Sequence, residues 1–287
     1  MTDNTSLKYH HAIAALLGQA LALSDEARRQ VAARERACGA AFPPSVKEWF
    51  SIGGAKQMFD ETGNHLESLE ELGRPEETRQ GYLRVATEVQ GVVGWYVRLS
   101  ESDDPPVFDN NDQWDKEDLN QVDWQLCSTS FTNFVFDAIA PWRFDGWGRG
   151  CYLVATAEQP GPEVLEQLRT YFKEGPHTES PGKVFRFVDD HALLTIASNR
   201  PEHLGNSTAE WIVNADSPET LCERTRLIWP YHGLSRAFRS ESHCIEAAGP
   251  GWSVIERLAK EYPQLGPCRT APQKAARRNW RFWRRTR

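Results

Sequence analysis

The chain has 287 residues, about twice the usual size of one domain, and this length predicts two compact units. Hydrophobic residues make up 40% and charged residues 25% of the chain, which is typical of a globular protein and excludes a collagen-like, membrane-embedded or wholly disordered one. The net charge of −7 argues against general nucleic-acid binding, because a phosphate-binding surface needs an excess of Lys and Arg.

The charge is distributed unevenly along the chain. Residues 274–287 contain seven basic residues and no acidic ones, so the rest of the chain has 26 basic and 40 acidic residues and a net charge of −14. The sequence therefore consists of an acidic body and a short basic tail. The six cysteines are widely spaced and form no CxxC pair, which is typical of reduced thiols and predicts a cytoplasmic protein.

The first element expected is an amphipathic helix over residues 12–23, where apolar residues recur at helical spacing. Asp3 precedes this run and Gln19 interrupts it, which disfavours a signal peptide. His10 and His11 lie at the start of this helix, and we expect both to be solvated.

Two more helices are indicated by their capping residues. Ser24 is a typical N-cap, and the helix that it begins is expected to end near Gly39. Pro44 suits the first turn of the next helix, which carries a stripe of buried apolar residues and ends before Gly53-Gly54.

Short antiparallel strands are expected next, over residues 81–86, 91–99 and 106–108, since these runs are rich in Val, Tyr and Trp. Trp95 lies on the second of these strands and is expected in the core. Residues 128–140 then show the apolar spacing of a closing helix, and Pro141 with the glycines up to residue 150 marks a break.

The second half contains a weak repeat of a strand followed by a helix that begins with proline. The two copies start at Tyr152 and Trp211, and their helices start at Pro162 and Pro218. A hairpin over residues 184–197 lies between them, and a later helix is expected over residues 252–262. We therefore predict an α+β fold whose second domain follows a ferredoxin-like split βαβ plan.

Several short motifs follow one another in the first half. They are FPPSVKEWF at residues 42–50 with the glycine pair after it, GWYV at residues 94–97, PVFD at residues 106–109 and SFTNF at residues 130–134. Their order over residues 24–140 resembles the SUKH superfamily, the group of the yeast Smi/Knr cell-wall regulators and many bacterial toxin-immunity proteins. The resemblance does not extend into residues 150–287.

This resemblance implies an N-terminal SUKH-like domain, a mixed sheet with packed helices, that works by binding another protein. The expected organisation is a SUKH-like domain at residues 1–145, an α+β domain of unknown role at residues 151–265 and a basic tail rich in Trp and Arg at residues 266–287. In bacteria, domains of this family commonly neutralise a toxin by occupying its active surface.

The segment from residue 101 to residue 123, called here the acidic segment, has nine acidic residues and a single lysine. One interpretation is a solvated loop. The other is a protein-binding surface, in which Trp114 anchors a basic partner, such as a nuclease toxin, within a negative field. The candidate partner-binding residues are Asp103, Asp104, Asp109, Asp112, Trp114, Asp115, Glu117 and Asp118.

The basic tail has tryptophans at helical spacing among arginines. Such a helix could bind anionic lipid or single-stranded nucleic acid, but the acidic body favours docking of the tail on the second domain. The candidate docking residues are Arg277, Arg278, Trp280, Arg281, Trp283, Arg284 and Arg285.

No sequence motif of a common enzyme class is present, so we assign no catalytic residue, cofactor or metal. The run Asp189-Asp190-His191 is interpreted as a hairpin tip. A zinc site is also disfavoured, since the spacing of its candidate ligands fits no standard finger and Cys222 is expected to be buried. Those candidate ligands are Cys222, His232, His243 and Cys244.

The function predicted is therefore that of a non-enzymatic protein that binds another protein, with toxin neutralisation as the first hypothesis. The alternative is a regulatory scaffold of the Smi/Knr type that its basic tail recruits to membrane or nucleic acid.

Overall fold

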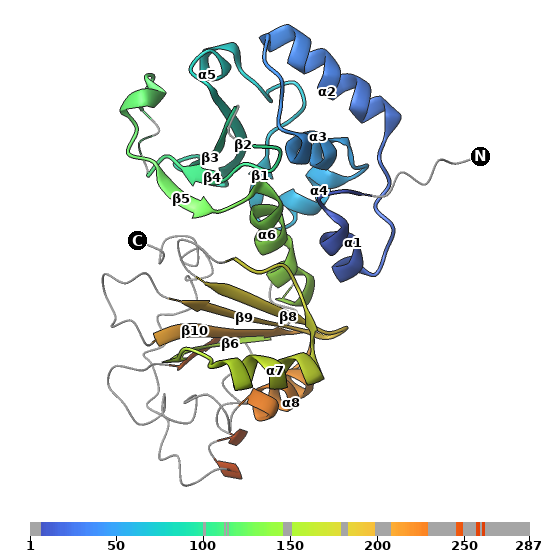
Figure 1. The fold of residues 1–287 in the computed structure, drawn as a ribbon, viewed down its shortest axis with the longest axis vertical. Helices are drawn as coiled ribbons and strands as arrows, with labels where there is room; N and C mark the ends of the chain where they lie inside the picture. Colours follow the sequence, from blue (N-terminus) through green and yellow to red (C-terminus); the bar gives the residue numbers. More distant parts are fainter. Residues whose placement is uncertain are drawn as a thin grey trace, which may run out of the picture. The chain divides into compact units, whose positions relative to one another are not determined.

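The computed structural model describes residues 7–99, 102–111, 113, 115–145, 151–178, 183–198, 208–228, 245–248, 257–258 and 260–261. Contacts within the chain divide it into two compact units, Met1–Ala140 and Pro141–Arg287, and each has its own helices and its own β-sheet (Figure 1). The α+β class predicted from the sequence is confirmed.

Unit 1 begins with four helices. They are α1 (His11–Leu17), α2 (Asp25–Cys38), α3 (Pro44–Ser51) and α4 (Ala55–Asp60). Ser24 caps α2 as predicted, since its Oγ accepts a hydrogen bond from the backbone N–H of Ala27. The expected start of α3 in its proline pair is also confirmed.

The first helix is shorter than predicted. It ends at Leu17 because Gly18 adopts a left-handed conformation with φ of 63° and its N–H bonds back to the carbonyls of Ala14 and Ala15. The expectation of a helix up to residue 23 was therefore wrong. Leu23 instead forms an isolated antiparallel bridge with Ile52.

The sheet of unit 1 has the order β1-β2-β3-β4-β5. Its strands are β1 (Asn64–Leu66), β2 (Tyr82–Glu88), β3 (Gly94–Arg98), β4 (Val107–Asp109) and β5 (Gln125–Ser128), and α5 (Pro75–Thr78) and the 3₁₀ turn η1 (Leu119–Gln121) lie between them in the chain. Each described pairing is antiparallel, so the mixed sheet that the family resemblance implied is not found. The connections β2–β3 and β3–β4 are too short for the crossover of about a dozen residues that a parallel pair requires.

The last helix of unit 1, α6 (Phe131–Asp145), continues through Pro141, where the sequence predicted a break. Its first turns complete the core. The ring of Phe134 lies 5.7 Å from that of Trp95 and 5.9 Å from that of Phe59, and all three side chains are buried. The prediction that Trp95 is a core residue is therefore confirmed.

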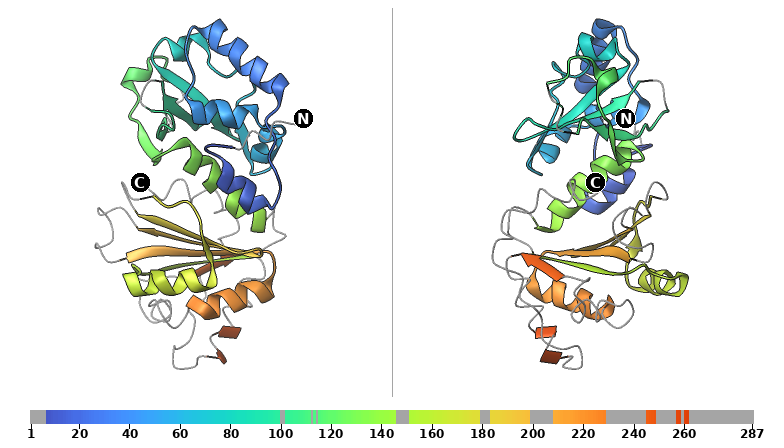
Figure 2. Two further views of the ribbon diagram at one scale, coloured as in Figure 1. Left: turned by 45° about the vertical axis from the view of Figure 1, so that its right-hand side comes forward. Right: turned by 90° about the vertical axis from the view of Figure 1, so that its left-hand side faces the viewer.

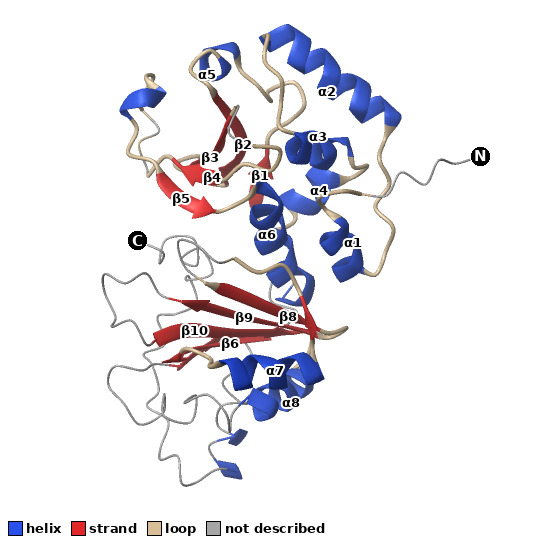
Figure 3. Ribbon diagram, viewed as in Figure 1, coloured by secondary structure: helices blue, strands red, loops and turns tan. Residues whose placement is uncertain are grey.

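Unit 2 has a sheet of order β11-β6-β10-β9-β8-β7. Its strands are β6 (Cys151–Glu158), β7 (Lys173–Glu174), β8 (Val184–Val188), β9 (Ala192–Ser198), β10 (Thr208–Ala215) and β11 (Ile245–Ala248), and its helices are α7 (Pro162–Tyr171) and α8 (Pro218–Ile228). Both helices lie on the same face of the sheet (Figures 2 and 3). Trp211, Leu221 and Leu168 are among the buried residues of the core between helices and sheet.

The repeat of strand and helix is present, and its strand order matches the ferredoxin-like plan. Four strands in the order β11-β6-β10-β9 are antiparallel neighbours, and the repeated strands β6 and β10 pair at their centre, with Val213 opposite Leu153. Both strand–helix–strand units are split, since β10 lies between β6 and β9, and β6 lies between β10 and β11. Strands β8 and β7 extend the sheet beyond β9.

Of the helix predicted over residues 252–262, the structure describes residues 257–258 and 260–261, all of them helical. Within the described residues, none of the helices combines the length and the apolar character that crossing a membrane would require.

Candidate protein-binding surface

The face of the unit 1 sheet opposite Phe134 carries a second, smaller group of apolar residues, called here the aromatic cluster. Its members are Tyr82, Tyr96, Leu119, Val122 and Trp124. The strands place Tyr82 and Tyr96 on this face because side chains alternate along β2 and β3, so that Leu83 and Trp95 point into the main core. The other three residues come from the acidic segment and from the residue that follows it.

Trp124 is the centre of this cluster. Its ring stacks on Tyr82 at 4.9 Å and meets Tyr96 edge to face at 5.0 Å, while its indole N–H donates a hydrogen bond of 3.1 Å to the carbonyl of Leu119. Aromatic pairs in these geometries stabilise a contact beyond the area that they bury. The C-terminal part of the acidic segment is therefore attached firmly to the sheet.

Gln80 holds the same segment from the side of α5. Its Oε1 accepts a hydrogen bond of 2.8 Å from the backbone N–H of Leu119, and its Nε2 donates one of 3.2 Å to the carbonyl of Glu117. Gln80 thus satisfies backbone groups on both sides of Asp118, which fixes the path of the exposed residues there.

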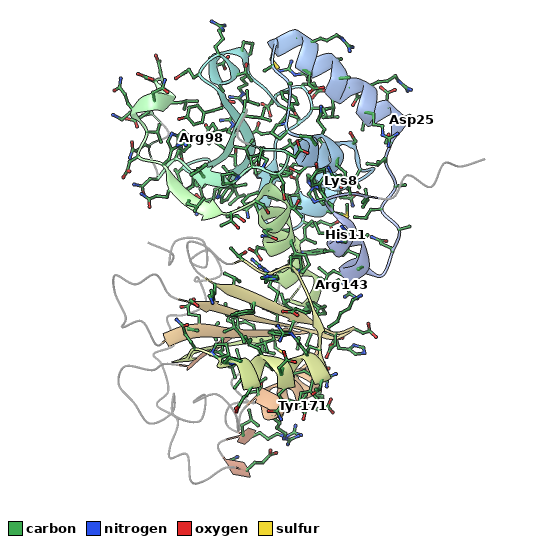
Figure 4. The ribbon with its side chains drawn as sticks, viewed as in Figure 1. Lys8, His11, Asp25, Arg98, Arg143 and Tyr171 are labelled. Carbon is green, nitrogen blue, oxygen red and sulfur yellow. The ribbon has the colours of Figure 1, made fainter. Side chains whose placement is uncertain are left out.

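Arg98, labelled in Figure 4, extends the cluster toward β4. Its guanidinium group lies 4.7 Å from the ring centroid of Phe108 and 6.0 Å from that of Tyr82, within the range of cation–π attraction.

A buried ionic group borders the aromatic cluster. The Nε atom of Arg84 lies 2.9 Å from a carboxylate oxygen of Glu67 and 3.7 Å from one of Glu77. Burial raises the pKa of Glu77, because the loss of hydration outweighs the attraction of Arg84 and Arg74. Burial likewise raises the pKa of the Tyr96 hydroxyl.

Gly94 lets this group and the cluster approach each other. A Cβ atom at this position would lie 2.8 Å from Cε2 of Tyr96 and 3.4 Å from Cδ of Arg84. Any larger residue would push the Tyr96 ring away from its place beside Trp124.

Among the acidic residues predicted to bind a partner, three have local structural roles. Asp104 accepts a hydrogen bond of 3.0 Å from the backbone N–H of Thr132 in the first turn of α6. Asp109 is buried at the end of β4, where it accepts hydrogen bonds from the N–H of Asn111 and the thiol of Cys127.

Asp118 is the third of these residues, and it caps η1. Its carboxylate accepts hydrogen bonds from the side chain of Gln121 and from the backbone and side chain of Asn120, and these bonds lower its pKa. The Asp118 side chain nevertheless remains exposed.

Two of the remaining predicted residues, Asp115 and Glu117, are exposed on the attached part of the segment. Asp103 lies elsewhere, where its carboxylate is 3.6 Å from the ammonium of Lys8 and accepts a hydrogen bond from the hydroxyl of Tyr9. Asp112 and Trp114 lie outside the described residues. So do all of the tail residues proposed for docking, namely Arg277, Arg278, Trp280, Arg281, Trp283, Arg284 and Arg285.

The aromatic cluster was not predicted from the sequence because its members come from three separated segments. The signal was present in the alternation of Tyr82 with Leu83 and of Tyr96 with Trp95, which places an aromatic residue on each face of the sheet. The prediction that His10 is solvated was also wrong, since its side chain is fully buried.

The residues considered for catalysis or zinc have other roles where the structure describes them. Asp189 accepts hydrogen bonds from the backbone of His191 and Ala192, as the predicted hairpin tip requires, and the His191 ring lies 2.7 Å from Asp216. Cys222 is buried, as expected, and burial raises its pKa. The other zinc candidates, His232, His243 and Cys244, lie outside the described residues, and the described residues contain no group of three or more His, Cys, Asp or Glu arranged to hold a metal ion.

Comparison with known proteins found no family model, curated protein or solved structure that matches this chain. The resemblance to the SUKH superfamily therefore stays a prediction from the sequence motifs.

Proposed function

We propose that this protein is a cytoplasmic bacterial immunity protein, which neutralises a basic, nuclease-type toxin by binding it directly through the acidic segment of unit 1. One observation carries the proposal, namely that the exposed carboxylates Asp115, Glu117 and Asp118 lie beside residues anchored in the aromatic cluster. An anchored segment loses little conformational freedom on binding, so more of the interaction energy is available for affinity.

The charge of the segment suits a basic partner. A nuclease presents cationic residues because it must bind phosphates, and acidic residues that match them increase the association rate and exclude neutral or acidic proteins. Trp124 is half-buried and bonds to Leu119, the residue after Asp118, so an apolar contact surface adjoins the charged one. Interfaces commonly combine such an aromatic centre with a charged rim.

The test is calorimetric titration of the purified protein with candidate toxins encoded beside its gene. The double variant Asp115→Lys with Glu117→Lys is expected to weaken binding about tenfold or more, since it places like charges opposite a basic partner. The matched control is Glu70→Lys with Asp190→Lys, which makes the same change in net charge at exposed positions outside the segment.

The control variant is expected to bind like the wild type. The proposal fails if none of the candidate toxins binds. If a toxin binds and the two double variants bind it equally well, a different surface of the protein is responsible.

A further inference from the structure

Residues 8–10 form a strap that precedes α1 and is held by α3. The carboxylate of Glu48 accepts three backbone hydrogen bonds, from the N–H groups of Lys8 at 2.7 Å, Tyr9 at 2.8 Å and His10 at 2.8 Å. Hydrogen bonds to a charged acceptor are stronger than neutral ones. The strap therefore has a defined path in spite of its position before the first helix.

The side chain of His10 anchors the strap in the interior. It is fully buried, and its ring lies 5.0 Å from that of Trp49 on α3 and 5.9 Å from that of Phe131 on α6. Nothing in the proposed binding function requires a histidine at this place, and a phenylalanine would fill similar space without the need to satisfy polar atoms.

The hydrogen bonding of the ring is that of a neutral histidine. Nε2 lies 3.0 Å from the carbonyl oxygen of Ser45, which can only accept, so Nε2 carries the proton. The other nitrogen, Nδ1, is buried and has no hydrogen-bond partner among the described residues. Protonation would place a second N–H there without an acceptor, in surroundings that hydrate the new charge poorly.

The charged groups around the ring do not compensate for this penalty. Glu48 on α3 and Asp104 in the loop before β4 favour the charged ring, and His11 on α1 opposes it. Burial is the largest effect, and it lowers the pKa of His10 below the ordinary value of 6.5.

We propose that residues 8–10 are a pH-released strap, which stays closed while His10 is neutral and opens when His10 takes up a proton. The open strap lets the imidazolium ring reach water, and the backbone bonds to Glu48 are lost with it. Opening also removes Lys8 and Tyr9 from the carboxylate of Asp103. The strap thus occupies Asp103 at neutral pH with the same chemistry, a cation and a hydroxyl donor, that a basic partner would offer.

The role given to Asp103 rests on the proposed function, whereas the opening of the strap does not. The experiment therefore measures the strap alone. Hydrogen exchange of the full chain is followed by mass spectrometry at pH 7.5, 6.5 and 5.5, and the rates at the backbone amides of Tyr9 and His10 are corrected for the intrinsic effect of pH.

For the wild type, the corrected exchange rate is expected to increase by up to about tenfold as the pH is lowered from 6.5 to 5.5. In this range the open form takes up a proton on His10 that the closed form does not. His10→Phe keeps a ring against Trp49 and cannot titrate, so its corrected exchange should not change with pH. His10→Gln tests the same point with a side chain that keeps an N–H donor. The matched control is His65→Gln, which removes an exposed histidine outside the strap and should behave like the wild type.

Two results would overturn the proposal. One is a corrected wild-type exchange rate that does not change with pH. The other is a change with pH in the two His10 variants that is as large as the change in the wild type. If both variants exchange freely at every pH because the strap no longer closes, proton NMR of the wild-type imidazole decides the matter. A His10 titration midpoint below 6.5 supports the strap, and a midpoint at or above 6.5 contradicts it.

Discussion

Trp124 stacks on Tyr82, with ring centroids 4.9 Å apart and ring planes at 22°, although the two residues are far apart in the sequence. This contact joins the end of the acidic segment to the second strand of the unit 1 sheet. The exposed carboxylates Asp115, Glu117 and Asp118 therefore belong to a segment whose end is attached to the sheet.

Removing the Trp124 ring should destabilise unit 1. Trp124→Ala is expected to lower the free energy of unfolding by about 2–4 kcal/mol, because it deletes the stacked ring and the hydrogen bond to Leu119. Trp124→Phe keeps an aromatic ring and should cost less. Urea denaturation followed by circular dichroism measures both, and a loss below about 0.5 kcal/mol for the alanine variant would show that the cluster does not hold the segment.

Asp104 should act on stability, because its carboxylate caps α6. Asp104→Ala is expected to lower the free energy of unfolding by about 1 kcal/mol, the usual effect of losing an acceptor at a helix N-terminus. Asp104→Asn keeps an oxygen acceptor and should be milder, while Asp115→Ala, an exposed neighbour in the same segment, should change stability little. Thermal denaturation of the three variants tests this, and equal effects of the three would contradict the capping role.

Glu77 should contribute a distinct dependence of stability on pH. Burial raises its pKa above the unfolded value of 4.5, so the folded state takes up this proton more readily than the unfolded state. Its contribution to stability is therefore fully present below pH 4.5 and is lost as pH rises through the higher pKa of the folded state.

The measurement is the free energy of unfolding of the wild type and of Glu77→Gln at several pH values. The wild type should gain stability relative to the variant as pH falls from 7 toward 4.5. The exposed neighbour Glu76→Gln serves as the control. If the stability of the wild type relative to Glu77→Gln instead decreases over this range, burial is not the largest effect on the pKa of Glu77.

Local structure could be predicted where a few neighbouring residues decide it. The caps at Ser24 and Gly39, the proline start of α3 and the helix that contains Phe134 all follow from such neighbours. The end of α1 was missed because Gly18 stops the helix while the apolar pattern continues beyond it.

The edge of the unit 2 sheet and the binding surface could not be predicted in this way. The repeat at Tyr152 and Trp211 indicated the ferredoxin-like plan, in which these two strands pair, but not the short strand β7 that extends the sheet beyond β8. The acidic segment was recognised by its charge, yet its division into capping and exposed residues depends on contacts with Gln80 and Thr132, which lie outside it. His10 was misjudged for the same reason, since its burial depends on Trp49 and Phe131.

The central claim is that the carboxylates of the acidic segment attract a basic protein partner. The most direct test is the association rate constant with a toxin that binds, measured by stopped-flow fluorescence from low to high salt. We expect the wild-type rate to fall by about tenfold or more as salt rises, and the variant Asp115→Lys with Glu117→Lys to start from a lower rate and respond less. A wild-type rate that salt does not change, together with an equal rate for the variant, would contradict the account.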